Sequence, residues 1–416
     1  MVKKELGIGV LLLVLCAVVA WQNPRFLSAV NLENTAALVG MYGIFSIGLG
    51  LVIITGGIDL SVGSLFALQG VMFGLMLGTA AWPESFGGGT TDFPWWLAAI
   101  LMVLGTMLLG LIHGLLITKA KMQPFIVTLC GLLIYRGAAR YLANDSSIGY
   151  GTERYGFLRS LQDGSLPAIP IPLLLSVVAI VLVVLAVRGH LTRVRAGRRM
   201  QLGDKIGLSA ATVFTAFVAA LMAGWGSMEP IGRIPREADF GTLFQLLATQ
   251  SVALPMPFVL LIIVAVIAGV VLHGSVYGRY LYAVGRNEEA TRFSGVNTKA
   301  VIASVYVIAA ALAALSGLLF AFYSNAITPA SHGSFYELFG IAAAVLGGCS
   351  LRGGEGSILG ILLGAILIQV LQNLVNLLGL PSSLNFAVMG VIILLGVLAD
   401  QTLRGRGGAR RGAATA

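Results

Sequence analysis

Long apolar segments dominate this sequence and decide what kind of fold it can form. Crossing a hydrocarbon core of about 30 Å as a helix takes roughly 20 apolar residues. Because lipid offers the backbone no hydrogen-bond partner, each such run is expected to be helical. The sequence therefore predicts an all-α polytopic membrane protein of about 10–12 transmembrane helices, forming one domain over residues 1–416. The runs lie near residues 7–22, 35–54, 60–80, 95–117, 124–143, 171–187, 206–225, 251–272, 300–322, 335–348 (a short one), 357–377 and 385–399.

Composition excludes a soluble fold. Apolar residues make up 57% of the chain and charged residues only 10%, whereas soluble domains carry about 25% charged residues. The 54 glycines fit a membrane protein, because glycine lets helices pack closely in lipid. Cys16, Cys130 and Cys349 all lie in apolar runs, so we expect neither a disulfide nor a metal site.

Basic residues are distributed unequally between the loops. With a cytoplasmic N-terminus, nineteen of the 26 lysines and arginines fall in cytoplasmic segments and five in the opposite loops. This bias is typical of cytoplasmic loops and predicts that both termini lie in the cytoplasm. The net charge of +9 then reports membrane orientation, and no basic patch with interleaved aromatic residues indicates a nucleic-acid partner. The Gly/Arg/Ala-rich tail at 404–416 is expected to be disordered.

Several catalytic motifs are missing from the sequence. It contains no G-x-x-x-x-G-K-[ST] loop, so we expect no ATP hydrolysis by this chain. It also contains no H-E-x-x-H motif or Cys/His cluster, and hence no predicted catalytic residue. The four histidines, expected at interfaces, are His113, His190, His273 and His332.

A first polar constellation lies between the second and third apolar runs, in the segment TGGIDLSVGS at residues 55–64. Two adjacent glycines favour a helix break, and an aspartate can accept hydrogen bonds from the N–H groups of the next helix. Transporters use such discontinuous helices to place helix ends at a cavity; a capped cytoplasmic turn is the alternative. The residues of interest are Gly56, Gly57, Asp59, Ser61, Gly63 and Ser64.

A second constellation is the polar loop at residues 274–299. Asn287 followed by Glu289–Arg292 predicts a short capped helix, which Gly285 and Gly295 bound on either side. A rigid polar helix between two membrane helices suits docking of a soluble cytoplasmic partner. An ordinary solvated loop is the alternative.

Three motifs occur in a fixed order: GGIDLSVGS at 56–64, GRNEEATRFSGVN at 285–297 and VLGGCSLRGGEGS at 345–357. Together they resemble the membrane permeases of ribose- and xylose-type ABC sugar importers, over most of the chain. In that family the second motif is the coupling helix that seats in a groove of the ATPase. The resemblance gives this role to Gly285, Asn287, Glu288, Glu289, Ala290, Arg292 and Gly295.

The resemblance also implies partners. They are ATP-binding subunits (two, or one fused chain), a periplasmic sugar-binding protein and a second copy of the permease, in a bacterial inner membrane. ATP and Mg²⁺ would be used by the ATPase, and this chain would bind no cofactor. Residues 188–250 add a basic connector and an extra hydrophobic run, a layout more similar to the xylose-type permeases, which favours a pentose.

A third constellation follows from helix geometry in the run 357–377. Gly356, Gly360 and Gly364 recur every four residues, and at about 100° per residue they are expected to face away from a stripe of amides. Amides donate and accept hydrogen bonds, which matches a hydroxyl-rich ligand. This stripe could line the sugar path or form interhelical bonds at a dimer axis; it consists of Gln369, Gln372, Asn373 and Asn376.

The function expected from these observations is the transmembrane path of a monosaccharide importer. A branched-chain amino acid permease of the same superfamily is an alternative, although a zwitterionic substrate would favour charges in the path. A membrane enzyme acting on lipid-linked substrates is a second alternative. It would need clustered ionisable residues at one membrane face.

Overall fold

The computed structural model describes residues 2–150, 167–180, 202–225, 227–231 and 239–379, together with a few isolated positions. Three predicted features lie wholly or mainly outside the described residues. They are the basic connector at 188–201, the last apolar run at 385–399 and the tail at 404–416.

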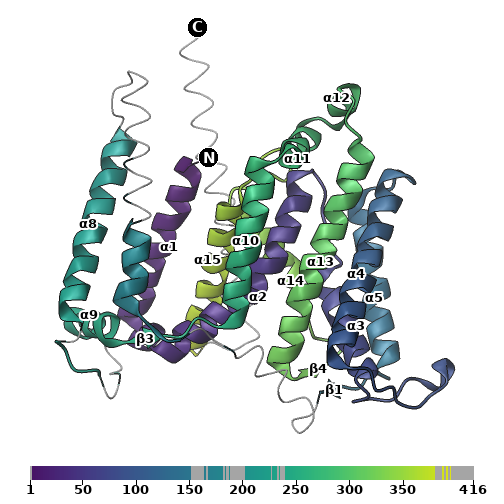
Figure 1. Ribbon diagram of the computed structural model, residues 1–416, viewed down its shortest axis with the longest axis horizontal. Coiled ribbons are helices and arrows are strands. Elements are labelled where there is room, and N and C mark those ends of the chain that lie inside the picture. Colours follow the sequence, from purple (N-terminus) through teal and green to yellow (C-terminus); the bar gives the residue numbers. More distant parts are fainter. Residues whose placement is uncertain are drawn as a thin grey trace. The chain divides into compact units, whose positions relative to one another are not determined.

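Helices form most of the described chain, as its apolar runs predict (Figure 1). Six of them are long and apolar enough to cross a membrane. Each coincides with a predicted run. They are α2 (Ala29–Ile54), α4 (Trp95–Thr118), α5 (Pro124–Leu142), α10 (Met256–Gly274), α13 (Thr298–Ser324) and α15 (Ile358–Leu377).

Other predicted runs form shorter helices. α3 (Val62–Met76) has 15 residues and α14 (Tyr336–Leu346) has 11, and at about 1.5 Å per residue neither can cross the hydrocarbon core alone. The run 171–187 is helical over 171–180, and α1 (Val2–Gln22) and α8 (Leu202–Gly224) occupy two further runs. Among the described residues, two α-helices were not predicted: α9 (Phe240–Thr249) and α11 (Val276–Arg286).

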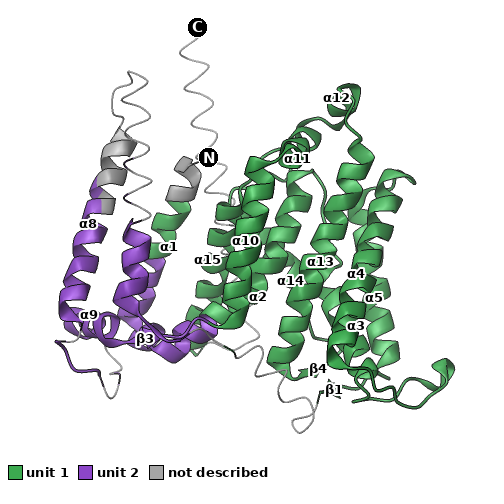
Figure 2. Ribbon diagram, viewed as in Figure 1, with its two compact units in different colours: residues 1–13, 36–164, 255–416 green, residues 14–35, 165–254 purple. Residues whose placement is uncertain are grey.

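The chain divides into two compact units (Figure 2). The first consists of residues 1–13, 36–164 and 255–416, and the second of residues 14–35 and 165–254. The expectation of one domain over the whole chain therefore stays a prediction.

The second unit contains the described part of the central insertion. Strand β2 (Ile169–Pro170) pairs antiparallel with β3 (Ser251–Val252). At the start of α2, the backbone N–H of Ala29 donates to Gln250 Oε1 (2.6 Å), and Glu33 Oε1 accepts from the N–H of Ala253 (2.8 Å). The C-terminal part of the insertion is therefore tied to the beginning of α2.

Small residues bring the helices of the first unit together. A Cβ at Gly110 or Gly114 of α4 would press against Tyr306 or Ala303 of α13. Likewise, Gly364 of α15 lies directly on the carbonyl of Ala343 in α14. Such close backbone approach is how helices associate where lipid supplies no hydrophobic drive. Within this frame α3 is largely buried, and α14 packs on α15.

Candidate functional site

The first polar constellation interrupts a membrane helix. α2 ends at Ile54 and α3 begins at Val62, with Gly56 at φ +84° between them. Asp59 is only 4% exposed, and its Oδ1 accepts from the N–H (2.8 Å) and the hydroxyl (2.7 Å) of Ser61. Its partner is thus the residue that precedes the helix, not an N–H group of the first helical turn. Such burial differs from a solvated cytoplasmic turn.

A second interruption follows α13. That helix ends at Ser324, and a short strand β4 (Ala326–Ile327), paired with β1 (Ile148–Gly149), leads into a loop before α14 begins at Tyr336. Asn325 and Phe335 both have positive φ, 51° and 66°. Such values are uncommon outside glycine and occur mostly in turns. They mark a sharp turn of the chain at each end of this loop.

The two interruptions share a sequence pattern that the sequence analysis missed. Both read S-x-G-S-x-x-x-L-x-G, at residues 61–70 and at residues 331–340, an offset of 270 positions. The preceding helices end at Ile54 and Ser324, the same offset apart. An internal comparison of the two halves of the sequence could have revealed this repeat.

The repeated glycines touch each other. A Cβ at Gly63 would overlap the carbonyl of Gly333, and a Cβ at Gly333 would overlap the carbonyl of Gly63. From this contact α3 runs toward β1, where its Gly74 meets Ile148, whereas α14 runs toward Gly347 and the start of α15. Two half-helices therefore meet at their N-termini, the arrangement that transporters use near the middle of the membrane.

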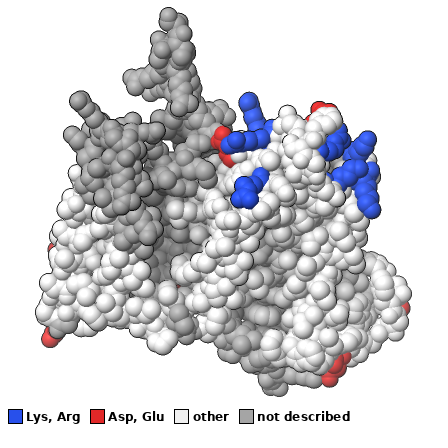
Figure 3. Space-filling model, turned by 45° about the horizontal axis from the view of Figure 1, so that its top comes forward, with Lys and Arg blue, Asp and Glu red and all other residues white. Residues whose placement is uncertain are grey.

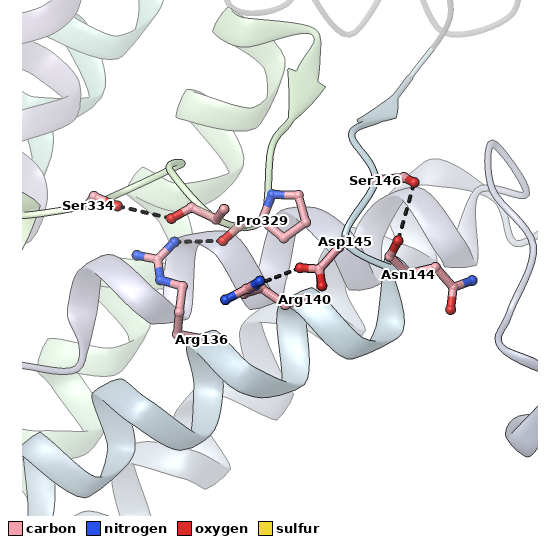
Figure 4. Close-up of polar contacts among 8 residues, drawn as sticks. Arg136, Arg140, Asn144, Asp145, Ser146, Pro329 and Ser334 are labelled. Atoms are coloured by element: carbon pink, nitrogen blue, oxygen red, sulfur yellow. Dashed lines mark hydrogen bonds and ion pairs between the residues drawn. The ribbon is translucent and has the colours of Figure 1, made fainter.

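Ionisable side chains gather around this junction. Glu337, in the first turn of α14, is 6% exposed and lies against Gly63. Arg136 of α5 donates to the carbonyl of Pro329 (2.9 Å; Figure 4). It also donates to the carbonyl of His332 (2.6 Å) and more weakly to that of Gly63 (3.4 Å). Charged groups inside a membrane protein mark functional sites by default.

One histidine expected at an interface is instead inside the helical core. His113 of α4 is 4% exposed, stacks on Tyr135 of α5, and its Nε2 lies 2.8 Å from the tyrosine hydroxyl. The apolar sequence around His113 does not predict this pairing, because Tyr135 lies on another helix.

The second constellation forms two short helices, α11 and α12 (Glu288–Phe293). The side chain of Asn287 accepts from the N–H of Ala290 (2.9 Å), and Gly295 has φ +84° just after the helix. Both signs of charge are exposed on α12, and its Arg292 and Glu289 lie 3.9 Å apart. This is the short capped helix that the sequence predicts. We call α11 and α12 together the lever.

The lever rests directly on the end of α2. A Cβ at Gly285 would overlap the carbonyl of Ile54 and the N–H of Gly354, and that N–H donates to the Ile54 carbonyl (2.8 Å). In addition, the hydroxyl of Tyr282 donates to the carbonyl of Gly356 (2.8 Å). Glycine at position 285 thus permits backbone contact between the lever, the first interruption and the loop before α15.

Basic side chains surround the lever at one end of the first unit (Figure 3). They come from the α4–α5 loop, the lever, the start of α13 and the loop before α15, all of them segments predicted to face one side. These exposed residues are Lys119, Lys121, Arg279, Arg286, Arg292, Lys299 and Arg352.

The four side chains of the predicted amide stripe differ in how far they are buried. Gln369 is 1% exposed, and neither of its amide atoms has a hydrogen-bond partner among the described residues. Gln372 and Asn373 are half-buried, and Asn376 is exposed. Of the glycines on this segment, Gly360 and Gly364 face α14, whereas Gly356 precedes the helix.

Comparisons with known proteins agree with the motif resemblance. Residues 31–205 and 205–397 match the family described as "Branched-chain amino acid transport system / permease component". The chain is 31% identical to the ribose import permease protein of Bacillus subtilis (strain 168), covering 96% of this chain and 94% of that protein. It is 30% identical to the xylose transport system permease protein of Escherichia coli (strain K12), covering 92% and 88%.

The ribose import permease protein of Escherichia coli (strain K12) is likewise 30% identical, over 94% of this chain and 91% of that protein. No solved structure gives a significant match. The resemblance predicted from the three motifs is therefore confirmed. The chain belongs to the family of transport-system permease components that includes these ribose and xylose permeases.

Proposed function

We propose that this chain is the permease subunit of an ATP-binding cassette importer and forms the transmembrane path for a monosaccharide. The observation that carries the proposal is the lever. The capped helix α12 exposes both charge signs and directly follows α11, whose Gly285 makes backbone contact with the end of a discontinuous membrane helix. Force applied to α12 by a cytoplasmic partner would reach the interruption at residues 55–61 without passing through a flexible loop.

The partners follow from this role. A cytoplasmic ATPase, as two subunits or one fused chain, would seat α12 in a groove and bind the ATP and Mg²⁺. A periplasmic sugar-binding protein would deliver the substrate, and two copies of this chain would form the pore. ATP-driven closure of the ATPase would rock the helices between outward and inward access. The protein would lie in a bacterial inner membrane with both termini in the cytoplasm.

A pentose is the proposed substrate. The ribose permease and the xylose permease are similar to this chain to nearly the same degree, at 31% and 30% identity. The amides of α15 would line the path, since Gln369 offers a buried donor and acceptor that no neighbouring described residue uses. A branched-chain amino acid remains the alternative substrate, as the family description names that class.

Reconstitution tests the proposal. Proteoliposomes would contain the chain with its ATPase and binding protein, and uptake of labelled ribose, xylose, glucose and leucine would be compared. We expect ATP-dependent accumulation of one pentose that stops when the ATPase is omitted. Accumulation against a gradient by the permease alone would contradict the proposal, and accumulation of leucine alone would favour the alternative substrate.

A further inference from the structure

We propose that Arg136 is a positioning residue for transport, whose guanidinium latches α5 to both discontinuous helices in one state of the cycle. The inference rests on the proposed function, because a latch matters only if the helices move between access states. The residue belongs to none of the three sequence motifs.

The contacts of Arg136 join segments far apart in the sequence. Its Nη1 donates to the carbonyls of Pro329 and His332, in the loop that leads into α14, and its Nη2 approaches the carbonyl of Gly63, in the first turn of α3. The acceptors at His332 and Gly63 belong to the two copies of the repeat, and Pro329 lies two residues before the second copy. A displacement of the loop before α14 against α3 that is larger than the side chain can follow must therefore break at least one of these bonds.

The chemistry of the contact is specific to arginine. A guanidinium presents five donors in a rigid planar fork, whereas a lysine ammonium is a point charge on a flexible stem. Glu337, close enough to interact electrostatically with Arg136, provides an opposite charge.

Arg140 provides a matched control on the same helix (Figure 4). It lies one turn further along α5, is exposed, and pairs through its Nε with the exposed Asp145 at 2.6 Å. Both arginines therefore contact acceptors outside their helix, but only Arg136 contacts the discontinuous helices.

The first experiment compares Arg136→Lys with Arg140→Lys in proteoliposomes containing the ATPase and the binding protein. We expect uptake by Arg136→Lys to fall about tenfold or more, within the usual range of coupling between sites. Its basal ATP hydrolysis should continue but no longer rise when loaded binding protein is added. Arg140→Lys should stay within about twofold of the unsubstituted chain, because exposed ion pairs contribute little.

A second measurement does not depend on how well the Arg136 variant folds. Ser331, exposed in the loop before α14, would be changed to cysteine in a chain whose three native cysteines are replaced by alanine. With Arg136 intact, labelling by a water-soluble maleimide should differ between the nucleotide-free and the ATP-and-vanadate-trapped complex. Equal labelling in the two states would overturn the latch.

Two further outcomes would also overturn it. One is normal uptake by Arg136→Lys. The other is normal uptake by the double variant Arg136→Met/Glu337→Gln, which would show that a neutral contact suffices. Absence of ATP-driven uptake by the unsubstituted chain would instead refute the proposed function itself, and the latch with it.

Discussion

The two discontinuous helices of the first unit share a motif but have different surroundings. At the first, from α2 to α3, the end of the long helix lies under the lever, with Ile54 against Gly285. At the second, from α13 to α14, the loop is held by Arg136, and α13 ends beside the strand β4. The first copy of the repeat is thus connected to the lever, whereas Arg136 contacts both copies where they meet.

This difference suggests that the two interruptions, which meet at the Gly63–Gly333 contact, are moved in different ways. The lever can move the first interruption directly, because three backbone segments meet at Gly285, Ile54 and Gly354 without intervening side chains. The second interruption is reached through the junction, where α14 touches α3, and through α15, whose Gly364 lies on α14 and whose preceding loop contacts the lever. Changes at the junction should therefore affect both copies directly.

The largest expected effect is at the junction. Gly63→Ala places a Cβ on the carbonyl of Gly333, and overpacking against a backbone typically costs about 1–3 kcal/mol. We expect a lower unfolding temperature in detergent, less protein in the membrane and no uptake. Gly105→Ala on α4 is the control, since a Cβ there meets no heavy atom within 4 Å. If the two variants have the same unfolding temperature, membrane level and uptake, the contact between Gly63 and Gly333 is not important for either stability or transport.

Next is the lever. The double variant Glu288→Ala/Arg292→Ala should leave assembly intact and uncouple ATP hydrolysis from uptake, with a loss of coupling of about 5- to 150-fold. The ratio of sugar transported to ATP hydrolysed is the measurement. Lys299→Ala, an exposed charge at the same end of the unit, serves as the control. If the double variant keeps a normal ratio, α12 is not the point where force enters.

Helix α15, which packs on the half-helix α14, carries the amides that are tested next. Asn373→Leu/Asn376→Leu should abolish uptake while the complex still assembles and hydrolyses ATP, because apolar side chains offer a sugar no hydrogen bond. Assembly is measured by size-exclusion chromatography of the purified complex. Unchanged uptake would remove these residues from the path and leave interhelical bonding as their role.

How much the sequence could reveal depended on where each signal lies. Twenty-residue apolar runs predicted α2, α4 and α13 correctly, because the bilayer imposes the length on each helix separately. Helix α12 was predictable because its capping residues, Asn287 and Gly295, are neighbours in the sequence.

What the sequence could not reveal depends on distant contacts. The hydrogen bonds of Arg136 reach residues 193 and 196 positions away, and their acceptors are backbone carbonyls, which any residue supplies. Likewise, 335–348 could be recognised as a short apolar run, but its role as a half-helix follows only from contact with Gly63. Helix α11 was missed because its buried residues, Gly278, Leu281 and Val284, are set among polar ones.

The smallest expected effect compares the backbone of the two interruptions. Both have a residue with positive φ: Gly56 at 84° in the first and Phe335 at 66° in the second. A left-handed conformation costs a residue with a Cβ about 1–2 kcal/mol, a cost that glycine avoids. Gly56→Ala should therefore lower stability by about 1 kcal/mol, and Phe335→Gly, whose side chain is half exposed, should raise it by up to about 1 kcal/mol. Thermal unfolding of the purified variants measures both changes.

If Phe335→Gly raises stability but slows uptake, the strained residue in the second interruption serves transport. If it raises stability and leaves uptake unchanged, the two interruptions differ in their surroundings and not in their backbones.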